Sequence, residues 1–84
     1  MGEALEVAES DEIMGGDDHE SHARRLGRLI REARKARGMT QAALAGDDFT
    51  ASFISQVERG LTTPSLKSLR IIASRLGLPV RYFL

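Results

Sequence analysis

Helix-capping residues and helix-ending glycines divide the chain from Ala23 onward into short segments. A hydroxyl residue precedes three of these segments, at Thr40, Thr50 and Ser65, and its oxygen can accept a hydrogen bond from a free backbone N–H at a helix start. Glycine ends the segments because it adopts the left-handed conformation found after many helices. The pattern predicts an all-α chain with five helices, over residues 23–37, 41–45, 51–59, 66–76 and 79–84.

Apolar residues recur at helical spacing within the longer segments. The first segment has them at i, i+3, i+4 and i+7: Leu26, Leu29, Ile30 and Ala33. This spacing is typical of a helix that buries one face. The third and fourth segments are expected to complete the core with Ile54, Val57, Leu61, Leu66, Leu69, Ile72, Ala73 and Leu76. The chain has no cysteine, so disulfides and thiolate metal sites are excluded and packing must supply the stability.

The net charge of zero conceals two regions of opposite sign. Residues 1–22 contain eight acidic residues and no Lys or Arg, a net charge of −8, whereas the remainder carries all 12 Lys and Arg against four acidic residues, a net charge of +8. The acidic region has too few apolar residues to repay ordering, so we predict a disordered tail over residues 1–22 and a single domain over residues 23–84. A basic domain attracts polyanions, because neutralised phosphates release their counterions.

Neither membrane insertion nor export is indicated by the sequence. The apolar runs are short, and the amino terminus lacks the basic and then apolar pattern of a secretion signal. We therefore expect a cytoplasmic protein.

The third helical segment has the composition of a DNA-reading helix. If Ile54 and Val57 face the core, the opposite face carries Ala51, Ser52, Ser55, Gln56 and Arg59. Glutamine can make two contacts to adenine, serine can bond several base edges, and the alanine methyl can touch a thymine methyl. Taken singly, such side chains are more often merely solvated residues of a helix surface. After a short helix and turn, however, they predict base reading in a major groove.

Three stretches of the chain together resemble the Cro/C1-type (XRE) helix-turn-helix family. They are RKARGMTQ at residues 34–41, SFISQVERG at residues 52–60 and TPSLKSLRIIASRLGLP at residues 63–79. The resemblance covers residues 24–84 and reproduces the order of core, exposed and capping positions. It implies a five-helix, lambda-repressor-like DNA-binding domain of a transcriptional regulator.

The resemblance also implies roles for particular residues. Gln41 would touch a DNA phosphate and brace the reading helix. Arg34 would pair with Glu58, whose carboxylate would be costly to bury alone. The bases would be read by Ala51, Ser52 and Gln56, to which the expected outer face of the helix adds Ser55. The contacts to the DNA backbone are expected from an amide, hydroxyl groups and basic side chains. These residues are Thr40, Gln41, Thr50, Arg59, Thr62, Thr63 and Lys67.

One stretch departs from the family pattern. Between Leu44 and Phe53 the chain is slightly shorter than the commonest form, with GDDF at residues 46–49 in place of a longer end to the second helix. We therefore expect a tighter turn. This version of the motif also looks similar to regulators that continue into tetratricopeptide-like repeats, so a C-terminal effector or repeat domain, absent from this chain, is an expected companion.

Metal binding and catalysis are weaker interpretations. His19 and His22 lie among acidic residues, but no further ligand stands at a diagnostic spacing, so we expect no metal and no cofactor. Glu58 as a catalytic acid would need a second group, and the sequence offers no nucleophile and base pair or phosphate loop. We expect that the chain is not an enzyme.

The leading prediction is sequence-specific binding of double-stranded DNA by the helix at residues 51–59. A homodimer would read two half-sites about one helical turn apart. Single-stranded binding is disfavoured because the four aromatic residues are too scattered to form a stacking platform. The alternative is a protein-interaction module that uses the acidic tail or the C-terminal helix, with DNA binding masked or absent.

Overall fold

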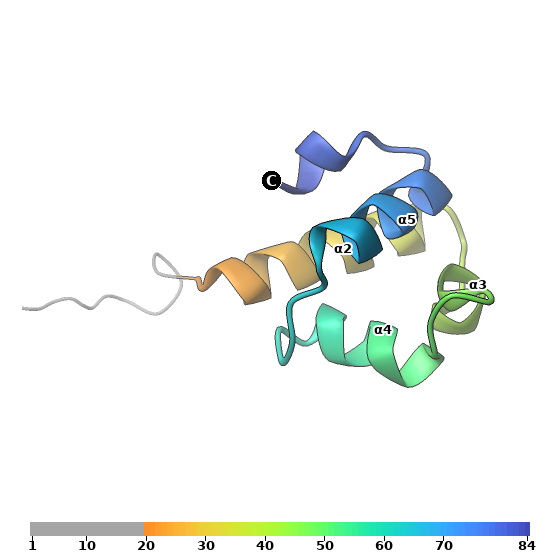
Figure 1. Cartoon of the computed structure of the whole chain (residues 1–84), viewed down its shortest axis with the longest axis horizontal. Helices are drawn as coiled ribbons and strands as arrows, with labels where there is room; N and C mark the ends of the chain where they lie inside the picture. Colours follow the sequence, from red (N-terminus) through yellow and green to blue (C-terminus); the bar gives the residue numbers. More distant parts are fainter. Residues whose placement is uncertain (1–19) are drawn as a thin grey trace, which may run out of the picture.

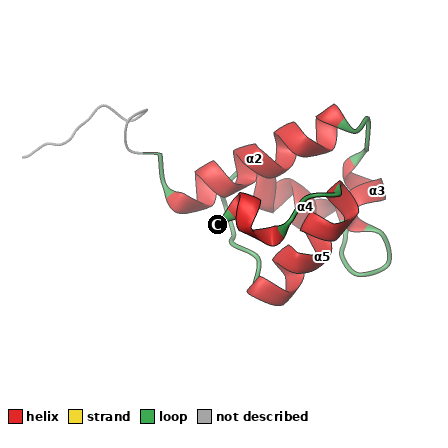
Figure 2. Cartoon of the chain, turned by 90° about the horizontal axis from the view of Figure 1, so that it is seen from above, coloured by secondary structure: helices red, strands yellow, loops and turns green. Residues whose placement is uncertain are grey.

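The computed structural model describes residues 20–84. In chain order these residues form α2 (His22–Ala36), α3 (Gln41–Ala45), α4 (Ala51–Glu58), α5 (Leu66–Leu76) and the 3-10 turn η2 (Val80–Phe83). Figure 1 shows α4 on one side of α2 and η2 on the other. Figure 2 shows that this part of the chain consists of helices and loops without strands, so the all-α prediction is confirmed.

The first helix begins one residue before the expected Ala23. The hydroxyl oxygen of Ser21 accepts a hydrogen bond of 3.1 Å from the backbone N–H of Arg24 and so caps α2. His22 is therefore helical, although the sequence placed it in the tail. The rest of the expected tail, residues 1–19, lies outside the described residues, and so does His19.

The next three helices begin where the sequence predicts. The capping residues are Thr40, Thr50 and Ser65. The hydroxyl oxygen of each accepts a hydrogen bond of 3.0 to 3.1 Å from the backbone N–H of the residue three positions later. These helix starts are set by local chemistry, because the cap supplies an acceptor to a donor that the helix itself leaves free. α4 ends at Glu58, and Arg59, the last residue of the predicted helix, forms its C-cap.

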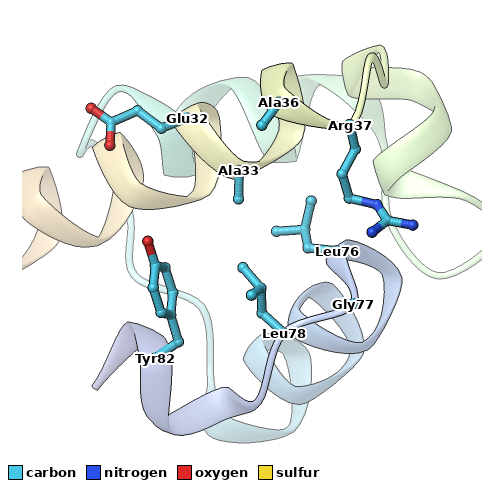
Figure 3. A pocket seen from close by; sticks show the side chains of 8 residues that line it. All are labelled: Glu32, Ala33, Ala36, Arg37, Leu76, Gly77, Leu78 and Tyr82. Atoms are coloured by element: carbon cyan, nitrogen blue, oxygen red, sulfur yellow. The ribbon is translucent and has the colours of Figure 1, made fainter.

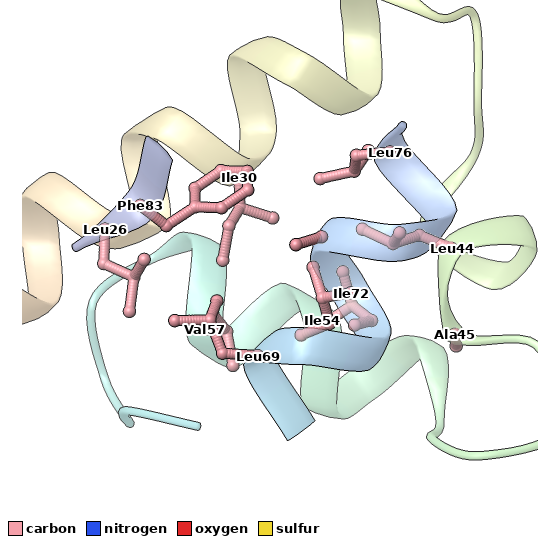
Figure 4. Packing of buried hydrophobic residues seen from close by; sticks show 11 residues of the cluster. Leu26, Ile30, Leu44, Ala45, Ile54, Val57, Leu69, Ile72, Leu76 and Phe83 are labelled. Atoms are coloured by element: carbon pink, nitrogen blue, oxygen red, sulfur yellow. The ribbon is translucent and has the colours of Figure 1, made fainter. Parts of the chain in front are cut away.

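Every element contributes to one hydrophobic core. Figure 4 shows side chains from α2, α3, α4, α5 and η2 converging on this core. Its buried residues are Leu26, Ile30, Leu44, Ala45, Ile54, Val57, Leu69, Ile72, Ala73, Leu76 and Phe83. Burial of this apolar surface is the main favourable term in folding. The core thus fixes which face of each helix remains available for function.

Two leucines that were expected in the core are exposed. Leu61 is 65% exposed and Leu66 is 51% exposed. Gly60 has a φ of +74°, which ends α4 and takes Leu61 out of the helical register. Leu66 is the first residue of α5, one turn before the apolar stripe of that helix reaches the core at Leu69.

The expected fifth α-helix is wrong: residues 20–84 contain four α-helices, and the last segment is a 3-10 turn. The N–H of Tyr82 donates to the carbonyl oxygen of Pro79 at 3.0 Å, and the N–H of Leu84 donates to that of Arg81 at 3.2 Å. These i to i+3 bonds define the tighter helix. So short a segment is a poor α-helix nucleus, and the tight turn lets Phe83 reach full burial in the core.

Candidate DNA interface

α4 divides its side chains between the core and solvent. Ile54, Val57 and Glu58 are buried, whereas Ala51, Ser52 and Gln56 are exposed, as is the C-cap residue Arg59. Ser55, which the sequence placed on the outer face, is half-buried. The exposed face carries a methyl, a hydroxyl and an amide within two turns, which is a set of groups able to contact base edges.

The expected DNA-backbone residues come from α3, from both ends of α4 and from the segment that leads into α5. Thr40 caps α3 and Gln41 is its first residue, while Thr50 and Arg59 cap the two ends of α4. The remaining residues follow α4 in the chain, in the loop before α5 and in the first turn of α5: Thr62, Thr63 and Lys67. All seven are exposed or half-buried, so the structure leaves each of them accessible to a ligand.

A bidentate ion pair joins α2 to the end of α4. The Nε of Arg34 donates to Oε2 of Glu58 at 2.6 Å, and its Nη2 donates to Oε1 at 3.0 Å. Both residues are buried, with 9% of their surfaces exposed. The hydrogen bonds from Arg34 to the Glu58 carboxylate raise the pKa of the guanidinium above its ordinary value. In this bidentate geometry each buried group supplies the hydrogen-bond partners that the other needs away from water.

The same pair reaches α3 and the turn before it. The Nη1 of Arg34 donates to the carbonyl oxygen of Met39 at 2.8 Å. The Nε2 of Gln41 donates to Oε1 of Glu58 at 3.2 Å. One arginine therefore connects α2, the α2–α3 turn and, through Glu58, the first residue of α3. This network holds the Gln41 side chain against Glu58, the last residue of α4.

Gly27 of α2 lies directly against the backbone at the end of α4. A Cβ at this position would stand 2.2 Å from the carbonyl oxygen of Val57 and 2.7 Å from that of Glu58. Any side chain there would therefore push α2 and α4 apart. The role of Gly27 could not be predicted from the sequence, because a glycine within a helical pattern carries no information about which backbone approaches it.

Arg75 of α5 is a second residue whose role the sequence pattern does not indicate. Its guanidinium donates to the carbonyl oxygens of Leu44 and Ala45 at 3.1 and 2.6 Å and pairs with the carboxylate of Asp48. These partners lie in α3 and in the turn that leads to α4. In the sequence Arg75 resembles an ordinary solvated arginine near a helix end.

The N-terminal end of the described chain is held by an exposed ion pair. Glu20 accepts hydrogen bonds from Nε and Nη2 of Arg28 at 3.1 and 3.0 Å. These hydrogen bonds lower the pKa of Glu20 below its ordinary value. The pair fixes the residue before the Ser21 cap to the outer surface of α2.

A separate open groove lies away from α4, between α2, the end of α5 and η2. It has a volume of about 440 Å³, with Ala33, Ala36, Leu76 and Leu78 among its lining residues. Figure 3 shows Tyr82 at one end of the groove and Arg37 at the other. Because η2 and α4 lie on opposite sides of α2, this groove does not belong to the polar face of α4.

Within residues 20–84, every helix is too short or too polar to span a lipid bilayer. In the same residues, no three side chains of His, Cys, Asp or Glu lie close enough together to hold a metal ion.

Comparison with known proteins places this arrangement among DNA-binding helix-turn-helix domains. The model of the helix-turn-helix family matches residues 30–83. The HTH-type transcriptional regulator DdrOP3 of Deinococcus deserti is 38% identical over 52 residues, which cover 61% of this chain and 40% of DdrOP3.

Two solved structures share the fold. PlcR of Bacillus thuringiensis, solved in complex with the peptide PapR7 and DNA, superposes with a TM-score of 0.70 at 36% identity, over 73% of this chain and 22% of PlcR. The restriction-modification controller protein C.AhdI of Aeromonas hydrophila superposes with a TM-score of 0.65 at 31% identity, over 74% of this chain and 96% of C.AhdI. The chain thus spans well under half the length of DdrOP3 and PlcR.

These matches and the geometry of α3 and α4 define a helix-turn-helix domain of the kind found in transcriptional regulators. The chain belongs to the Cro/C1-type (XRE) helix-turn-helix family.

Proposed function

We propose that this chain binds double-stranded DNA sequence-specifically, with α4 in the major groove. The observation that carries the proposal is the division of α4 into two faces. Ile54, Val57 and Glu58 fix one face to the core, so the exposed residues Ala51, Ser52 and Gln56 project from a helix that cannot rotate. A rigid helix with a small, polar outer face can enter a groove and discriminate bases.

Each exposed residue of α4 suits a different base contact. The Gln56 amide can bond the N6 and N7 atoms of adenine, and the Ser52 hydroxyl can donate or accept at several base edges. The Ala51 methyl can contact the methyl group of thymine. Ala51 and Ser52 stand in the first turn of α4, the end that reads base edges when a recognition helix lies in the groove.

The flanking residues supply contacts to the DNA backbone in this proposal. Gln41 is oriented by its hydrogen bond to Glu58 and is half-buried, so part of its side chain remains open to a phosphate. Arg59 and Lys67 provide charge, and the hydroxyls of Thr62 and Thr63 provide hydrogen bonds. Such contacts fix the register of a protein on DNA without reading its sequence.

The domain is proposed to work as the N-terminal part of a dimeric transcriptional regulator. PlcR was solved with DNA, and DdrOP3 is a transcriptional regulator; both are much longer than the region matched here. A single domain of this size makes few phosphate contacts, so two copies on half-sites about 34 Å apart would supply the affinity that one copy lacks.

The test is selection of preferred sites from a pool of random duplexes, followed by affinity measurement on the selected duplex and on a scrambled duplex of equal length. We expect a symmetric selected site and an affinity about 1,000-fold higher for the selected duplex. Equal affinity for both duplexes at every salt concentration would contradict sequence-specific reading.

A further inference from the structure

The turn between α3 and α4 is held from outside by Arg75. This residue lies in the last turn of α5, 27 positions after Asp48 in the chain. Its Nη1 donates to the carbonyl oxygens of Leu44 and Ala45, the last two residues of α3, at 3.1 and 2.6 Å. Its Nη2 pairs with the carboxylate of Asp48, within the turn. Three acceptors on one short segment thus converge on a single guanidinium.

These contacts satisfy groups that α3 leaves free. The last carbonyl oxygens of a helix have no partner within the helix, and they form the negative end of the helix dipole. A planar guanidinium can donate to several acceptors at once, which an ammonium group does less well. Because α3 has five residues, it has little intrinsic stability and its position depends on such outside contacts.

Gly46 allows the close approach of Arg75. It adopts a φ of +54° and a ψ of −141°, a backbone conformation that other residues rarely adopt. A Cβ at Gly46 would stand 2.8 Å from Cζ of Arg75, so the guanidinium packs on the bare backbone of the turn. The short GDDF segment therefore forms one unit with Arg75.

We infer that Arg75 is a positioning residue for DNA reading: it fixes the end of α3 and the turn, and thereby the start of α4. The inference rests on the proposed function, since its consequence for DNA depends on base reading by Ala51 and Ser52. These residues follow the turn directly, so a displacement of Asp48 and Phe49 is carried to the helix end that faces the bases.

A direct phosphate contact is the competing role for Arg75. The side chain is 27% exposed, and its donors are already directed at the turn. A phosphate-binding arginine would affect all DNA sequences alike. A positioning arginine would affect the selected sequence more than a random one, because only base reading depends on the orientation of α4.

The first measurement uses the DNA-free protein. The N–H of Phe49 donates to the carbonyl oxygen of Ala45 at 3.1 Å, the same oxygen that Arg75 binds. In Arg75→Gln we expect the Phe49 amide to exchange with solvent about tenfold faster than in the wild type. The Ile30 amide in the core serves as the internal reference for both proteins. Arg81→Gln removes an exposed arginine from η2 and serves as the matched control. Equal Phe49 exchange in the two variants would overturn the inference.

The second measurement uses the selected and scrambled duplexes. In Arg75→Gln we expect about a tenfold loss of affinity for the selected duplex, and on the scrambled duplex only the loss that Arg81→Gln also shows. Equal losses on both duplexes, with a reduced salt dependence, would identify a phosphate contact and overturn the inference.

Arg75→Lys keeps the charge and serves if Arg75→Gln does not fold. We expect smaller effects in the same direction in both measurements, because the ammonium lacks the planar fork. A lysine variant identical to the wild type in both would show that the guanidinium geometry is not needed. If the wild-type protein prefers no duplex, the proposed function fails, whereas the Phe49 exchange still decides whether Arg75 holds the turn.

Discussion

Arg34 and Glu58 form a two-point ion pair between α2 and α4, with N···O distances of 2.6 and 3.0 Å. The pair ties the end of α4 to α2, and its carboxylate also accepts a hydrogen bond from Gln41. The stability of the domain and the presentation of the reading face therefore depend on the same contact.

Removal of one partner of this pair should destabilise the domain strongly. In Glu58→Ala the buried guanidinium of Arg34 loses its carboxylate, and we expect the free energy of unfolding to fall by about 3 to 5 kcal/mol. Urea denaturation followed by circular dichroism gives this value. Glu32→Ala, which removes an exposed carboxylate from α2, should change stability by no more than about 0.5 kcal/mol. Similar small effects for both variants would show that the buried pair does not stabilise the fold.

Gly27 provides a test of helix packing that is independent of charge. In Gly27→Ala the added Cβ meets the Val57 carbonyl oxygen at 2.2 Å, so we expect a loss of about 3 kcal/mol from overpacking. Gly38→Ala is the matched control, because a Cβ there meets nothing within 4 Å and only its φ of +68° opposes the change. The control should cost about 1 to 2 kcal/mol. A Gly27 variant as stable as the wild type would mean that α2 and α4 do not approach as closely as described.

Local and distant determinants differ in how well the sequence predicts them. The helix starts at Thr40, Thr50 and Ser65 were predicted, because a cap acts on backbone groups three residues away. The exposed position of Leu61 is not predicted by the helical period, because the period ends at Gly60, where the chain turns. The 3-10 turn at residues 80–83 was also missed, because the burial of Phe83, which is a tertiary effect, decides its form.

The candidate site shows the same division. The outward positions of Ala51, Ser52 and Gln56 follow from the helical period once Ile54 and Val57 are assigned to the core. The contributions of Gly27 and Arg75 depend on which segments approach them in space, and their own segments carry no sign of it. Ser55 lies between the two cases, because its half-buried position sits at the border of the two faces.

Lys67 should contribute to DNA affinity through charge alone. In Lys67→Ala we expect weaker binding to the selected and the scrambled duplex by the same factor, and a slope of log affinity against log salt that is smaller by about 1. Fluorescence anisotropy at several salt concentrations measures both quantities. A loss confined to the selected duplex would assign Lys67 to base reading instead, and Arg81→Ala controls for the general effect of one lost charge.

The Glu20 and Arg28 pair predicts a specific pH dependence. The hydrogen bonds from Arg28 lower the pKa of Glu20. Their contribution to the stability of the folded state is therefore present above the ordinary pKa of glutamate and is lost as the pH falls through the lowered pKa. An NMR titration of the Glu20 carboxyl should give a pKa below the ordinary value in the wild type and a higher pKa in Arg28→Gln. An unchanged Glu20 pKa in the variant would exclude the pair in solution.

The central claim, that the exposed face of α4 reads bases, is tested most directly by the base preference of Gln56→Ala. Gln56 is exposed and its removal should leave stability within about 0.5 kcal/mol of the wild type. Affinities for the selected duplex and all of its single-base variants should show that discrimination falls by about 1 to 3 kcal/mol at one base pair of each half-site and is retained elsewhere. An equal loss on the selected and scrambled duplexes, or no change in preference at any position, would contradict the claim.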